Sequence, residues 1–170
     1  MTPTTSALAN IDIVLVRPEN QGNIGAVARI IQNFGMGSLR IVLPRNFGAP
    51  SMQFDEEARR FAHRSENVLE QALSFPTVRD ALADRTWTIA MSGRSGGERP
   101  APASIRSVAS RLCWQAQYNS GTIVFGPESD GLTERDLVEC DAVVSIPQRR
   151  PEPSLNLAQA VAITSSELFH

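Results

Sequence analysis

Lysine is absent from this chain of 170 residues, so all sixteen basic residues are arginine. Without lysine the chain cannot carry a P-loop, whose phosphate-binding motif contains Lys followed by Ser or Thr. Cysteine and histidine are also scarce, at two residues each. Neither Cys113 nor Cys140 has metal-ligand spacing to the other or to a histidine, which argues against a metal site and favours inert thiols.

Long hydrophobic runs are missing as well. No run of 18 apolar residues exists, and the first ten residues lack the basic and apolar regions of a signal peptide. The formal net charge of −2 argues against nucleic-acid binding driven by total charge, although a local basic patch is compatible with it. With 42% hydrophobic and 20% charged residues, the composition predicts one soluble, cytoplasmic domain over residues 1–170.

Short apolar runs and amphipathic segments alternate along the chain. The runs predict strands, and the segments with helical spacing predict helices. We expect strands at 11–16, 38–43, 86–91, 121–125 and 142–146, and helices at 26–34, 55–73, 78–83, 104–118, 133–138 and 155–169. This alternation predicts an α/β domain with a parallel sheet, helices on both faces and functional sites at the strand ends.

The loop after the first expected strand, residues 17–29 (RPENQGNIGAVAR), is rich in Gly and Asn. Its glycines allow close backbone approach, and the following helix N-terminus favours an anion. The spacing does not match the dinucleotide fingerprint, and no acidic residue ends the second strand to hold a ribose. On composition alone, Asn20 and Asn23 are turn formers or helix caps, and Arg29 is a surface residue.

Two further loops follow strands. In 125–132 (FGPESDGL), Glu128 and Asp130 are either paired carboxylates or acidic residues that open the next helix. In 146–161 (IPQRRPEPSLNLAQAV), Ser154 is a natural N-cap, whereas Asn156, just inside the expected helix, is not explained by helix propensity.

The three loops together carry a resemblance that none of them carries alone. The ordered motifs NxGNIGAxAR, FGPExxGL and IPxxxxxxSLNLAQAV resemble the SpoU/TrmH branch of the SPOUT methyltransferases, and within it the TrmJ type of tRNA ribose 2′-O-methyltransferase. The resemblance implies a deep trefoil knot in the C-terminal part, an exception to the rule against knots. It also implies S-adenosylmethionine as cofactor, no metal, and a homodimer in which each site borrows residues from its partner.

The resemblance assigns roles to residues that match the motifs. Arg29 would be the catalytic base, Asn23 would hydrogen-bond near the ribose, and Glu128 would anchor its loop or hold Arg29. Ser154 and Asn156 would orient phosphate and cofactor loops. The expected cofactor-binding residues are Met91, Ser92, Gly93, Gly126, Ile146, Pro153, Ser154 and Leu155, and the expected RNA-binding residues are Arg17, Asn20, Arg94, Arg99, Arg149 and Arg150.

A guanidinium group is a poor base because it normally stays protonated. Either a neighbouring RNA phosphate relays the ribose proton while Arg29 holds that phosphate, or Arg29 is transiently deprotonated.

The resemblance implies methylation of the first anticodon-loop nucleotide of tRNA (position 32, C or U). The alternatives are the wobble nucleotide, a ribosomal RNA target, or a non-catalytic RNA-binding module. TrmJ-type enzymes usually carry a C-terminal extension that helps to bind tRNA, whereas this chain stops at His170 inside an expected helix. The sequence therefore predicts either a catalytic domain that lacks this extension or a single-domain enzyme of the TrmL type.

Overall fold

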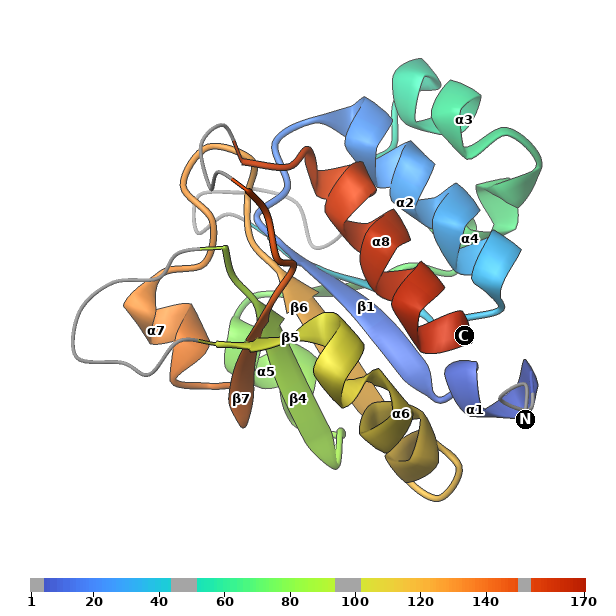
Figure 1. The fold of residues 1–170 in the computed structure, drawn as a ribbon. Coiled ribbons are helices and arrows are strands. Elements are labelled where there is room, and N and C mark those ends of the chain that lie inside the picture. Colours follow the sequence, from blue (N-terminus) through green and yellow to red (C-terminus); the bar gives the residue numbers. More distant parts are fainter. Residues whose placement is uncertain (1–4, 44–51, 94–101, 150–153) are drawn as a thin grey trace.

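The computed structural model describes residues 5–43, 52–93, 102–149 and 154–170, and it consists of one sheet between two layers of helices (Figure 1). Every strand pair is parallel, in the order β3-β2-β1-β6-β4-β7-β5. The strands are β1 (Ile11–Val16), β2 (Leu39–Val42), β3 (Leu73–Phe75), β4 (Trp87–Met91), β5 (Ala103–Ser104), β6 (Gly121–Phe125) and β7 (Ala142–Ser145). The predicted parallel α/β fold is confirmed. Sequence patterns missed β3 and β5 because strands of two or three residues have no readable periodicity.

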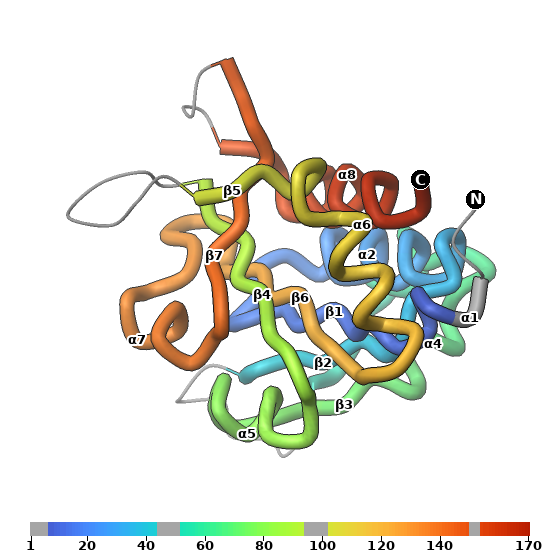
Figure 2. Tube along the Cα trace, turned by 60° about the horizontal axis from the view of Figure 1, so that its bottom comes forward, coloured from blue at the N-terminus to red at the C-terminus, as the bar shows by residue number. Residues whose placement is uncertain are grey.

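Helices cover both faces of the sheet, as expected (Figure 2). They are α1 (Thr5–Leu8), α2 (Gln21–Phe34), α3 (Glu56–Ala62), α4 (Glu66–Glu70), α5 (Val78–Leu82), α6 (Ile105–Ala116), α7 (Glu134–Leu137) and α8 (Leu157–Phe169). Alternate residues of β1 enter two separate cores. Ile11, Ile13 and Leu15 pack with α2, α6 and α8, whereas Val14 and Val16 pack with α5 and α7. Because both sheet faces are covered, β1 is buried along its whole length.

Helix α2 begins at Gln21, five residues earlier than expected. Asn20 has an extended backbone, and its side-chain oxygen accepts a hydrogen bond from the Asn23 amide, which caps the helix. The Gly/Asn segment expected as a loop is therefore the first turn and a half of α2. Gly25 is needed there for packing between helices, since a Cβ atom would lie 2.0 Å from the carbonyl oxygen of Ala58 in α3.

Substituting Gly25 should destabilise the protein far more than substituting its neighbour Gly22. In Gly25→Ala, the new methyl group meets the backbone of α3, so the helices must separate at a cost of about 1–3 kcal/mol. In Gly22→Ala, the methyl group meets only side-chain atoms of Asn20 and Phe61, at 3.1 and 3.2 Å, and alanine gains helix propensity. Urea denaturation of both variants measures the difference. Equal stability of the two variants would contradict this account of the α2–α3 contact.

The single helix expected over residues 55–73 is wrong. The chain forms α3, a 3₁₀ turn over residues 63–65 and then α4, and the break occurs at His63, whose φ is 55°. This turn redirects the chain so that both α3 and α4 contact α2. Such a break depends on the position of α2 and leaves no local signal in an amphipathic sequence.

No helix in the described ranges is long and apolar enough to cross a membrane. The chain path between β4 and β5 and between β7 and α8 includes residues 94–101 and 150–153, which lie outside the described residues. The knot therefore stays a prediction here.

Candidate active site

The motif loops meet at the carboxyl edge of the sheet, where α/β proteins bind their ligands. Strands β1, β6, β4 and β7 are consecutive neighbours in the sheet, so the segments that follow them lie side by side. Three motifs that are far apart in the sequence thereby reach one site.

Glu128 holds the first motif to the second. One carboxylate oxygen accepts hydrogen bonds from the Asn20 amide at 3.2 Å and from Asn23 Nδ2 at 2.8 Å, and the other accepts from the Glu19 amide at 2.9 Å. Of the two roles expected for Glu128, the structure places it against the first loop, and no ion pair joins it to Arg29.

The anchoring is reciprocal, because Glu19 holds the Glu128 loop in turn. Ser129 donates hydrogen bonds to Glu19 from its amide at 3.2 Å and from its hydroxyl at 2.5 Å. Sequence reasoning missed Glu19 and Ser129, since no local pattern relates two residues on different loops. The carboxylates of Glu19 and Glu128 thus join the segments that follow β1 and β6 through hydrogen bonds in both directions.

Asn156 brings the third motif to the same point. Its Nδ2 donates to Asn23 Oδ1 at 3.0 Å, while its own Oδ1 accepts from the amides of Ala158 and Gln159 and caps α8. The expected cap at Ser154 is therefore wrong, because α8 starts at Leu157 and Asn156 satisfies its free amides. Because a carboxylate can only accept, Glu128 requires Asn23 to present its Nδ2. The Oδ1 of Asn23 is then turned toward Asn156, which must present its own Nδ2.

Arg29 lies away from this network. It is exposed on α2 six residues after Asn23, about 9 Å further along the helix, and it makes no hydrogen bond or ion pair with any residue that the structure describes. Its guanidinium group is thus available to a ligand or to another chain.

Arg17 and Asn20, both expected to contact RNA, have structural partners. Arg17 has a φ of 51° at the end of β1, and its guanidinium group donates two hydrogen bonds to Asp136, at 2.5 and 3.2 Å. Burial would raise the pKa of Asp136, but hydrogen bonds from Arg17 and Thr133 outweigh it and lower that pKa. Asp136 also forms a capping box with Thr133 at the start of α7. Asn20 caps α2, as its residue type alone suggests.

Of the expected cofactor-binding residues, Met91–Gly93, Gly126 and Ile146 lie at or just after the carboxyl ends of β4, β6 and β7. Met91 and Leu132 are buried there, Ile146 is half-buried, and the Ser92 amide donates to Val144 across to β7. Among the described residues, the atom nearest to a Cβ atom on Gly93 would be Gln148 Nε2 at 3.8 Å. Apolar walls beside backbone groups fit a nucleoside-containing cofactor such as S-adenosylmethionine.

Gly126, one of the expected cofactor-binding residues, is also constrained by packing. A Cβ atom at Gly126 would lie 2.3 Å from the Leu132 amide nitrogen, so the residue is required by the fold of its own loop. Leu155 is half-buried and Ser154 is exposed between β7 and α8, and Arg149 is exposed after β7. Arg94, Arg99, Arg150 and Pro153 lie outside the described residues.

Metal ligands and reactive thiols do not appear in the described part of the chain. It contains no cluster of three or more His, Cys, Asp or Glu side chains that could hold a metal ion. Cys113 is buried and donates to the Leu168 carbonyl, and burial raises the pKa of the half-buried Cys140 to about 12. Burial and a raised pKa fit the prediction of inert thiols.

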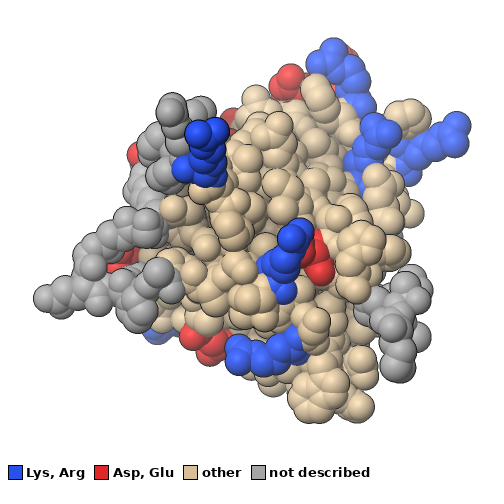
Figure 3. All heavy atoms as spheres, in the orientation of Figure 1, with Lys and Arg blue, Asp and Glu red and all other residues tan. Residues whose placement is uncertain are grey.

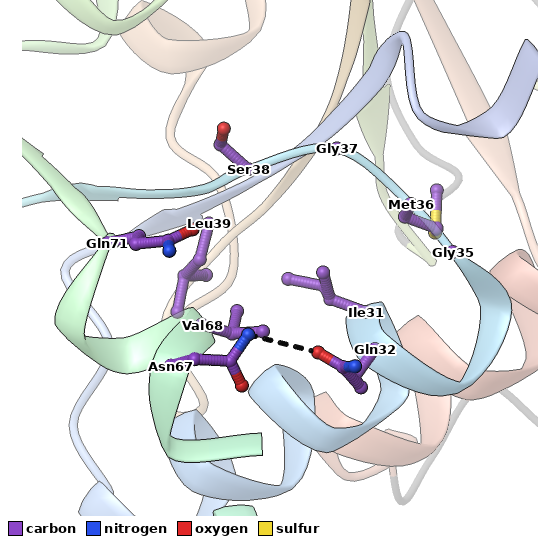
Figure 4. A pocket seen from close by; sticks show the side chains of 10 residues that line it. All are labelled: Ile31, Gln32, Gly35, Met36, Gly37, Ser38, Leu39, Asn67, Val68 and Gln71. Carbon is purple, nitrogen blue, oxygen red and sulfur yellow. Dashed lines mark hydrogen bonds between the residues drawn. The ribbon is translucent and has the colours of Figure 1, made fainter. Parts of the chain in front are cut away.

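A pocket of about 330 Å³ lies at the opposite end of α2, between Gly35–Leu39 and α4 (Figure 4). Gln32 and Asn67 face each other across it and share a hydrogen bond of 3.3 Å. The pocket contains none of the motif residues and lies at the amino end of β2, so it is separate from the site described above.

Comparison with known proteins assigns the fold and the site to one family. The profile of the SpoU rRNA Methylase family matches residues 10–166. The chain belongs to this family. SpoU methyltransferases use S-adenosylmethionine, and the trefoil knot is characteristic of their fold.

The relatives include enzymes of the TrmJ type. The chain is 35% identical over 162 residues to the tRNA (cytidine-2′-O-)-methyltransferase TrmJ of Methanocaldococcus jannaschii, covering 94% of this chain and 67% of that protein. The crystal structure of TrmJ from Z. mobilis matches with a TM-score of 0.79 and 34% identity, over 92% of this chain and 67% of that one. A probable methyltransferase from Bordetella pertussis matches with a TM-score of 0.85 and 33% identity, over 97% of both chains.

This chain spans about two thirds of the length of these two TrmJ proteins.

Proposed function

We propose that this protein transfers a methyl group from S-adenosylmethionine to a ribose 2′-hydroxyl of tRNA, at the first nucleotide of the anticodon loop (position 32, C or U). The observation that carries the proposal is the hydrogen-bonded chain Glu128–Asn23–Asn156, which joins all three motifs at the carboxyl edge of the sheet. TrmJ relatives named for this chemistry at 33–35% identity support the choice of substrate class.

The reaction requires in-line geometry and removal of a proton from a weak nucleophile. The cofactor would supply an electrophilic methyl group, and Met91–Gly93, Gly126, Ile146 and residues 153–155 would hold it. Asn23, whose orientation Glu128 and Asn156 fix, lies where it can position the ribose. Arg29 would hold an RNA phosphate that accepts the hydroxyl proton, because an exposed guanidinium group is a strong bidentate phosphate ligand.

The proposed active form is a homodimer. Helix α8 carries a single charged residue, Glu167, in 13 residues, and its half-buried Ala158, Ala162 and Ile163 lie between buried positions. The surface over α8 is mostly tan, with one blue and red pair beside it (Figure 3), and a mostly uncharged helix face of this kind favours contact with another chain. A second copy against α8 and the adjacent α2 could also reach the exposed Arg29 and complete the site.

Methyl transfer from labelled S-adenosylmethionine to an unmodified tRNA transcript tests the proposal. We expect label at position 32, and a transcript with a 2′-deoxy nucleotide at that position serves as the matched control that accepts none. Label at the wobble nucleotide would replace the proposed target with another tRNA ribose. Label in ribosomal RNA fragments but in no tRNA, or no transfer despite cofactor binding, would refute the proposed substrate.

Light scattering tests the dimer separately. The expected mass is twice the 18.5 kDa of the chain, and replacing Ile163 with Glu should shift it toward one chain, because a buried unpaired charge is costly. A single-chain mass for the unmodified protein at micromolar concentration would refute the dimer.

A further inference from the structure

An exposed aromatic pair lies at the C-terminal end of α6, with Trp114 in the helix and Tyr118 in the turn that follows it. The chain has one tyrosine and two tryptophans, and it places Tyr118 and Trp114 on the surface, 71% and 61% exposed. Their ring centroids are 5.6 Å apart with the planes at 63°. Two adjacent, exposed aromatic rings are a costly arrangement for a folded surface and are typical of a binding site.

The aromatic pair continues a polar strip along α6. Ser107, Arg111, Trp114 and Tyr118 follow one another at helical spacing, and all four are exposed while the opposite side of α6 is in the core. We call these four residues the α6 strip.

The segment of sequence that contains the α6 strip carries basic but no acidic residues. No Asp or Glu occurs between Glu98 and Glu128, whereas three arginines do, in a chain whose net charge is −2. Arg106 pairs with Glu167 of α8, but Arg111 makes no ion pair with a described residue. In Figure 3 this part of the surface is mainly tan, with blue patches that have red ones beside them. Arg111 therefore gives the strip a positive charge without a described counter-ion, which can bind a phosphate.

The α6 strip starts at the edge of the candidate site. Ser104, which caps α6, pairs with Ser145 at the carboxyl end of β7, so the first turn of α6 lies beside the loop after β7. The 12 residues of α6 then run about 18 Å away from that edge. A substrate bound in the site can reach the strip only if it is extended over such a distance.

We propose that the α6 strip is a second contact for the RNA substrate, in which an unpaired base stacks on Trp114 and Tyr118 and a neighbouring phosphate binds Arg111. The inference rests on the proposed function, since it assumes an RNA in the site. Arginine, serine and exposed aromatic rings are the combination that binds unpaired nucleotides. A second copy of the chain fits α8, with its single charged residue, better than this strip.

Equilibrium binding of an unmodified tRNA transcript tests the proposal. Trp114→Ala should weaken binding about 5- to 100-fold, the usual effect of losing one stacked base. Arg111→Ala should weaken binding and lower the slope of log K against log salt by about 1. Arg79→Ala is the matched control, because Arg79 is 79% exposed on α5, on the other face of the sheet. It should bind like the unmodified protein.

Quenching of Trp114 fluorescence by the transcript adds a direct readout, since Trp87 is buried. Unchanged affinity and no quenching, in a protein that still methylates the transcript, would overturn the α6 contact and leave the proposed function intact. If Trp114→Ala instead lowers the mass in solution with unchanged tRNA affinity, the strip belongs to a dimer contact and the proposal fails. Absence of any tRNA binding by the unmodified protein would overturn both proposals together.

Discussion

Arg29→Lys should reduce the rate of methyl transfer by about 10²- to 10⁴-fold, the contribution expected of an acid–base group such as the phosphate that Arg29 positions. Lysine keeps the charge but loses the planar pair of donors that binds two phosphate oxygens at once. Because Arg29 is exposed and has no partner among the described residues, its loss should change the free energy of unfolding by no more than about 0.5 kcal/mol.

The rate of single-turnover methyl transfer and the affinity for the cofactor should be measured together. Cofactor affinity should stay within about twofold, because Arg29 lies outside the network at the strand ends. Arg60→Lys is the control, since Arg60 is 73% exposed on α3. If Arg29→Lys retains more than a tenth of the rate, a positive charge alone is enough and the bidentate role is wrong.

Arg40→Met should destabilise the protein by about 3 kcal/mol, near the lower end of the cost of breaking a buried ion pair. The Arg40 side chain is 2% exposed in β2, and its Nε donates to Asp12 at 2.6 Å, while its two terminal nitrogens donate to Asp84. Burial alone would lower the pKa of Arg40, but these hydrogen bonds raise it above its usual value. Arg85 also contacts Asp12 at 2.9 Å, so Asp12 keeps one cationic partner in the variant and the loss of stability is limited.

A double-mutant cycle separates the ion pair from simple packing. Asp12→Asn keeps an acceptor for the Ser38 amide and removes the charge. The double variant Asp12→Asn/Arg40→Met should therefore be less destabilised than the sum of the single variants, by about 0.5–3 kcal/mol in urea denaturation. Additive effects would show that the Asp12 carboxylate and the Arg40 guanidinium group do not stabilise each other.

The ion pair illustrates what the sequence could not reveal. Arg40 stands in an apolar run, SLRIVL, which predicts a strand correctly, and nothing in that run marks the arginine as buried. Its partners come from β1 and from the segment after α5, so the pairing exists only once those elements are adjacent. The Glu19–Ser129 contact was missed for the same reason.

The sequence alone determined the order of the main strands and helices, because buried strands and amphipathic helices leave periodic patterns within a few residues. Its three motifs also marked Asn23, Glu128 and Asn156 as site residues, and these three form one hydrogen-bonded chain.

Only the tertiary structure decided the local geometry. It ended α3 at His63, began α2 at Gln21, and made Asn156 rather than Ser154 the cap of α8. It also showed that Glu128 bonds to Asn23 and not to Arg29, although the resemblance had offered a contact between Glu128 and Arg29. Each of these outcomes depends on contacts between elements that are distant in the chain, and the free energy of such contacts is set by their packing in three dimensions and not by local propensity.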